Sequence, residues 1–82
     1  MKIYSIDYIP GAQIEAIGLV RGDTRGYGDL IKDERGIAIN MMINEAKALG
    51  ADAIVGVRFE TTVYQELSAQ VLAYGTAVKI KD

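Results

Sequence analysis

Residues 37–64, IAINMMINEAKALGADAIVGVRFETTVY, place a helix, a helix stop and a strand in one continuous stretch. An amphipathic helix with one side on a core is predicted, because apolar residues recur at helical spacing while polar residues such as Glu45 take the other faces. The predicted core stripe consists of Ile39, Met42, Ile43, Ala46 and Leu49. Gly50 follows directly and favours a helix end there, because glycine adopts the left-handed conformation of a C′ residue without strain. β-branched and aromatic residues are frequent from Ala53 to Tyr64, which predicts a strand with Val55, Val57, Phe59 and Val63 on one face. This stretch therefore predicts a helix that packs on a sheet.

The segments on either side are mostly β-prone. Upstream, the helix is predicted to begin near residue 30, with Gly36 as a weak point that allows either two helical pieces or a loop through Lys32–Gly36. Residues 3–9 form a first predicted strand that ends at a Pro-Gly turn, and residues 13–21 form a second one, apolar on both faces. Residues 69–80 form a last strand that is also apolar on both faces. The order predicts an α+β fold: a two-layer β-β-α-β-β domain with one helix and a mainly antiparallel sheet.

Length and composition narrow the possible functions. With 82 residues, the chain fits a single domain over residues 1–82. It contains no cysteine and no histidine, which excludes disulfides, zinc sites built from thiolate or imidazole, and Cys or His nucleophiles. A net charge of −2 argues against nucleic acid as a partner. The first residues do not resemble a signal peptide and no apolar run has membrane-spanning length, so a cytoplasmic protein is expected.

The apolar pattern also predicts association. One helix covers one face of a sheet and leaves the other to water or to another subunit. Because the strands predicted over residues 13–21 and 69–80 are apolar on both faces, we expect a large exposed apolar surface. The sequence therefore predicts a homo-oligomer in which neighbouring sheets or edge strands meet.

Three stretches carry a family resemblance. Residues 49–60, LGADAIVGVRFE, together with residues 17–22, IGLVRG, and residues 73–78, AYGTAV, resemble the YbjQ-like family, which is labelled "putative heavy-metal-binding". The resemblance implies a dodecin-like βαββ core with extra strands, assembled as a ring-shaped homopentamer. The segment from Asp23 to Gly36 is shorter than the one that family members have before the helix.

Two parts of the chain contain candidate ligand-binding residues. Residues 21–28, RGDTRGYG, combine glycines that allow close backbone approach, arginines that can bind a carboxylate or phosphate, and an aromatic ring. They suit a small anionic or nucleotide-like ligand, although ordinary turn chemistry also explains them. Further along, Arg58 and Glu60 share one face of a predicted strand. They could line a pore or pocket, or form an ion pair at an interface. The candidate ligand-binding residues are Arg21, Asp23, Arg25, Tyr27, Arg58 and Glu60.

Two tyrosines of the predicted last strands form a possible contact pair. Tyr64 and Tyr74 lie on the two strands of the predicted last hairpin, where they could approach each other. Interface packing explains both residues without a ligand.

The donor atoms of the chain limit which metal ions it could bind. Soft heavy metals prefer sulfur ligands, and this chain offers only the thioethers of its three methionines, of which Met42 lies on the predicted core stripe. A hard cation such as Mg²⁺ or Ca²⁺ could use the carboxylates of Asp29, Asp33 and Glu34. Because basic residues are interleaved with them, a solvated charged segment is the alternative interpretation.

These observations support three hypotheses. The first is a small cytoplasmic protein that forms an oligomer and acts as a non-catalytic assembly or binding module, with itself as partner. The alternative is a protein that binds a small anionic ligand or a metal ion, with its site in the loop of residues 21–34 or between subunits. The third is an enzyme with a carboxylate site assembled by two subunits, although no catalytic pairing appears at a diagnostic spacing. No particular cofactor is indicated.

Overall fold

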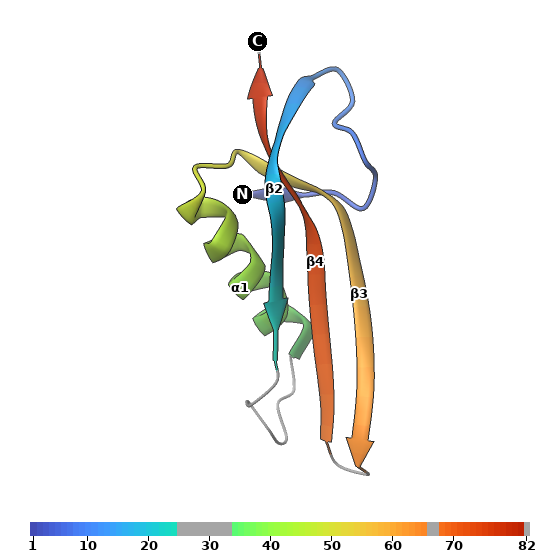
Figure 1. Ribbon diagram of the computed structural model, residues 1–82. Helices are drawn as coiled ribbons and strands as arrows, with labels where there is room; N and C mark the ends of the chain where they lie inside the picture. Colours follow the sequence, from blue (N-terminus) through green and yellow to red (C-terminus); the bar gives the residue numbers. More distant parts are fainter. Residues whose placement is uncertain (25–33, 66–67, 82) are drawn as a thin grey trace.

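The computed structural model describes residues 1–24, 34–65 and 68–81 (Figure 1). For residues 34, 62–65, 68 and 69 it describes the backbone only. Its elements are β1 (Lys2–Ile3), β2 (Gln13–Asp23), α1 (Glu34–Ala48), β3 (Ala53–Gln65) and β4 (Ser68–Lys81). The four strands form one sheet in the order β1-β3-β4-β2. One helix and a mixed four-stranded sheet confirm the α+β class. Within the described ranges, helix α1 is neither long enough nor apolar enough to cross a membrane.

The central feature of the sheet is β4, which lies between two strands that the helix connects. Both β2 and β3 pair with β4 in antiparallel fashion, so β2 and β3 run parallel to each other. Parallel strands need a crossover connection, and α1 provides it. The sheet is mostly antiparallel, as predicted, and only the short pairing of β1 with β3 is parallel.

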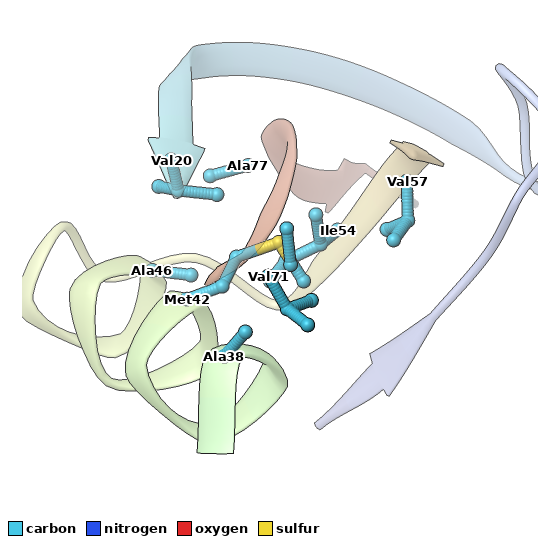
Figure 2. Packing of buried hydrophobic residues seen from close by; sticks show 9 residues of the cluster. Val20, Ala38, Met42, Ala46, Ile54, Val57, Val71 and Ala77 are labelled. Carbon is cyan, nitrogen blue, oxygen red and sulfur yellow. The ribbon is translucent and has the colours of Figure 1, made fainter. Parts of the chain in front are cut away.

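Helix α1 packs on one face of the sheet through a narrow stripe. Ala38, Met42 and Ala46 follow at intervals of four residues, are completely buried, and point towards the sheet (Figure 2). Of the predicted stripe, Met42 and Ala46 are confirmed as fully buried, Ile43 packs partly buried against the core, and Ile39 is half-buried. The predicted stripe also contained Leu49, which is wrong, because α1 ends at Ala48 and the side chain of Leu49 lies exposed.

A glycine allows α1 to lie close to β2. A Cβ atom at Gly22 would lie 1.8 Å from the carbonyl oxygen of Ala38 and 2.8 Å from the backbone nitrogen of Met42. Any other residue at this position would therefore collide with the helix backbone. The alanine stripe serves the same end, since a methyl group keeps a helix nearer to a sheet than a longer side chain does.

The N-terminal segment covers part of the opposite sheet face. Ile9 packs there in a second buried cluster with Ala53, Val55 and Val78. The prediction of a strand over residues 3–9 is wrong beyond Ile3, because β3 bulges and a regular ladder cannot continue beside it.

The bulge of β3 centres on Gly56. Its φ is +65°, and its N–H donates to the carbonyl of Ile6 at 2.8 Å. The bulge also changes which residues share a face. Val55 was predicted to lie on the same face as Val57, but Val55 belongs to the second cluster and Val57 to the helix-side core.

Candidate functional site

The sheet face opposite α1, which we call the outer face, is only partly covered. The N-terminal segment covers the end near Val55 and Val78. Towards the other end Tyr74 and Leu72 of β4 lie on the same face, and beside them on β2, across Thr76 from Val55, Leu19 is 83% exposed. Because exposed apolar patches on soluble proteins usually mark contact sites, this end of the outer face is the candidate functional surface.

Two cross-strand rows bring predicted site residues together on the outer face. In the first row Tyr74 of β4 pairs with Arg21 of β2 on one side and with Arg58 of β3 on the other. In the next row Leu72 pairs with Asp23 and with Glu60 in the same way. Directly opposed residues point to one face of a sheet, so four of the six candidate ligand-binding residues share a surface. The members of the two rows are Arg21, Tyr74, Arg58, Asp23, Leu72 and Glu60.

The register places the two tyrosines of the last hairpin apart. Tyr74 lies between two arginines, whereas Tyr64 follows Val63, which pairs with Ala69 near the hairpin end. The prediction that these tyrosines approach each other is therefore wrong. The alternation of β4 did carry a usable signal, because Leu72 and Tyr74 are two residues apart and had to share a face.

Two of the predicted site residues make contacts that hold the fold. The guanidinium of Arg58 donates to the carbonyl oxygens of Ser5 at 2.6 Å and Val57 at 3.0 Å, and so fastens the N-terminal segment to β3. The carboxylate of Asp23 accepts a hydrogen bond of 2.7 Å from the side-chain amide of Gln70. Sequence reasoning missed the contacts with Ser5 and Gln70, because each joins residues far apart in the chain.

The remaining candidate residues belong to the segment between β2 and the start of α1. Arg25, Tyr27, Asp29 and Asp33 fall outside the described residues. Glu34 is the first residue of α1. The structure therefore provides no geometry for the predicted cation site.

A groove of about 270 Å³ opens at the exposed end of the outer face. Leu19 and Arg21 are two residues apart on β2 and share a sheet face, and Tyr74, which pairs with Arg21, lines the groove from β4. The six lining residues are Leu19, Val20, Arg21, Glu45, Tyr74 and Gly75. Leu19 and Glu45 were not among the predicted site residues, since neither belongs to a recognisable motif.

The outer edge of β2 carries one polar contact with the helix. The backbone N–H of Arg21 donates to Oε1 of Glu45 at 3.3 Å. No strand within the described ranges pairs with this edge, and none pairs with β3 on its outer side beyond Val57. Unpaired strand edges are ready positions for pairing with another chain.

The described residues contain no group of three or more acidic side chains arranged to hold a metal ion. Soft-metal donors are limited further by burial. Met42 is 0% exposed and its thioether is packed against Ile54 and Val71 of the core, as Figure 2 shows.

The comparison with known families covers most of this fold. The YbjQ family model, whose description reads "Putative heavy-metal-binding", matches residues 18–81. The chain belongs to the YbjQ family. A UPF0145 protein of Clostridium novyi is 35% identical over an alignment of 102 positions, which covers 98% of this chain and 99% of that protein. The relatives thus support the resemblance carried by residues 49–60.

Other relatives match over a shorter stretch. A UPF0145 protein of Pseudothermotoga lettingae is 54% identical over 63 residues, or 77% of this chain and 59% of that protein. The matched stretch therefore spans about three fifths of that YbjQ relative. A crystal structure of a protein of unknown function from the DUF74 family of Pediococcus pentosaceus superposes with a TM-score of 0.74, covering 96% of both chains at 19% identity. It supports the fold.

The heavy-metal description of the YbjQ family does not fit the donors of this chain. Thiolate and imidazole ligands are absent from the sequence, and of the three thioethers that of Met42 is sealed in the core. Soft cations such as Cd²⁺ and Hg²⁺ bind proteins chiefly through sulfur. We therefore derive no metal chemistry for this chain.

Proposed function

We propose that this protein is a self-assembling, non-catalytic module in which the exposed end of the outer face meets a second copy of the chain. The observation that carries the proposal is Leu19, a large apolar side chain on the edge strand β2 that is 83% exposed. Tyr74 and Leu72 extend the apolar surface around it. A chain of this size has a thin core, so association adds buried area that the monomer lacks.

The strand edges support the same proposal. The outer edge of β2 and the outer edge of β3 beyond Val57 lie on opposite sides of the sheet. If the β2 edge of one copy meets the β3 edge of the next, the contact is head-to-tail, and such contacts form a ring when the rotation between copies closes. Five copies is the number that the family resemblance implies, and the cytoplasm is the compartment that we assign to the assembly.

The test is a carboxylate placed on the apolar surface. We expect Leu19→Asp to weaken self-association on the order of 100-fold, because a charge would have to be buried between copies. Sedimentation velocity and native mass spectrometry at micromolar concentration measure the change. The control is Asn40→Asp, which adds the same charge on an exposed position of α1, on the other side of the molecule. A wild-type protein that is monomeric at these concentrations would contradict the proposal.

A separate prediction concerns metal binding. We expect titration of Cd²⁺ into the purified chain to give no stoichiometric binding at micromolar affinity, because the chain has neither thiolates nor imidazoles. Isothermal titration calorimetry with a cysteine-containing protein as positive control measures this. One tightly held Cd²⁺ per chain would contradict the prediction, and would direct attention to the carboxylates of residues 29–34.

A further inference from the structure

The groove beside Leu19 contains two opposite charges that are not paired with each other. Arg21 and Glu45 both line it, and both residues are exposed. Within the described ranges no ion pair involves either residue. Glu45 accepts one long backbone hydrogen bond from Arg21 through Oε1, which leaves its negative charge uncompensated.

The rest of the lining is apolar. Tyr74 pairs with Arg21 across the two strands, and Leu19 lies two residues from Arg21 along β2, on the same sheet face. The side chain of Val20 is buried on the helix side, so this residue contributes only backbone to the floor. Small-molecule sites have this composition: a mostly apolar lining with a few polar groups that fix the orientation of the ligand.

We propose that this groove binds an apolar α-amino acid or a compound with the same pattern of charges. The carboxylate of the ligand pairs with the guanidinium of Arg21, for which a forked donor is suited. Its ammonium group pairs with the carboxylate of Glu45. The apolar side chain lies between Leu19 and the ring of Tyr74, and the volume of about 270 Å³ suits a molecule of this size.

This inference rests on the proposed function in one respect. The groove lies in the surface that we assign to self-assembly, so a second copy would shield the bound molecule from water. The chemistry of recognition comes from one chain only. Ligand binding and assembly can therefore be measured separately.

The experiment compares three probes that differ only in their charges. L-phenylalanine carries both charges, 3-phenylpropanoate only the carboxylate, and phenethylamine only the ammonium group. Calorimetric titration of each into the wild-type chain should give the tightest binding for phenylalanine, with each truncated probe about tenfold weaker. Equal affinities for the three probes, or no binding of any, would overturn the proposal.

Two variants assign each charge to its residue. Arg21→Gln should weaken binding of phenylalanine and phenylpropanoate about tenfold and leave phenethylamine unchanged. Glu45→Gln should weaken binding of phenylalanine and phenethylamine and leave phenylpropanoate unchanged. The control is Glu15→Gln, an exposed carboxylate on the same strand outside the groove, which should change nothing. Identical losses for all three probes in either variant would contradict the assigned roles.

Sedimentation velocity on the same samples separates the two proposals. A monomeric protein that binds phenylalanine with the expected pattern would support the groove and contradict self-assembly. An assembled protein that binds none of the three probes would contradict the groove and leave self-assembly standing.

Discussion

Gly22→Ala is expected to destabilise the protein by about 3 kcal/mol, because a Cβ atom there would lie 1.8 Å from the carbonyl oxygen of Ala38. That oxygen belongs to the helix backbone, so α1 must move away from β2 and lose part of its packing. For a domain of this size the loss is a large fraction of the total stability, roughly 4–12 kcal/mol. Thermal unfolding followed by circular dichroism at one protein concentration should show a melting temperature lower by roughly 15 °C.

The matched control for this change is Gly18→Ala on the same strand. A Cβ atom at Gly18 would have only the Cδ1 atom of Leu49 nearby, at 3.8 Å, which is an ordinary contact. We expect its effect on the free energy of unfolding to stay within about 1 kcal/mol. Equal effects of the two substitutions would show that the close approach of α1 to β2 is not what Gly22 provides.

Met42→Ala is the second large effect that we expect. The side chain of Met42 is completely buried between α1 and the sheet and contacts residues of β3 and β4, so its removal leaves a cavity in the main core. Substitutions of this kind cost about 2–5 kcal/mol. Urea unfolding should show a lower midpoint with an unchanged slope, the sign of a native state that is weakened without a change of unfolding mechanism.

Two companion variants separate packing from helix propensity. Met41→Ala makes the same chemical change one residue earlier, at a half-buried position of α1, and should cost less than half as much. Met42→Leu keeps most of the volume and should cost less than about 1.5 kcal/mol. If Met41→Ala were as harmful as Met42→Ala, the assignment of Met42 to the centre of the core would be wrong.

Local features of the fold were readable from the sequence. Gly50 was predicted to stop the helix, and it lies two residues past the end of α1 with a φ of +79°. β3 and β4 occupy the two predicted strand segments after it, with longer bounds. Such features depend on the conformational preferences of a few adjacent residues, which is why they can be predicted without knowledge of the rest of the chain.

The candidate site was predictable only in part. Arg21 and Arg58 were both selected as ligand-binding residues, yet nothing in their sequence positions showed that Tyr74 lies between them. Glu45 was read only as a helix surface residue, although it reaches the edge of β2. These neighbours follow from strand order and register, which are set by contacts between distant segments.

Other properties were determined by the sequence alone. The absence of cysteine and histidine rules out thiolate and imidazole chemistry in this chain whatever its fold, because no arrangement of the chain can supply a missing side chain. The order of β-prone and helical segments fixed the α+β class. The apolar residues on both faces of β4 meant that one helix could not cover all of them.

The tertiary structure decided which of these residues act together. Only the packed fold shows that Gly22 admits the backbone of α1, that the bulge at Gly56 separates Val55 from Val57, and that Arg58 fastens the N-terminal segment. Only the fold places Leu19 uncovered beside the groove. The physical reason is the range of the interactions: propensities act between neighbours in the chain, whereas packing distances, register and exposure depend on the whole set of long-range contacts.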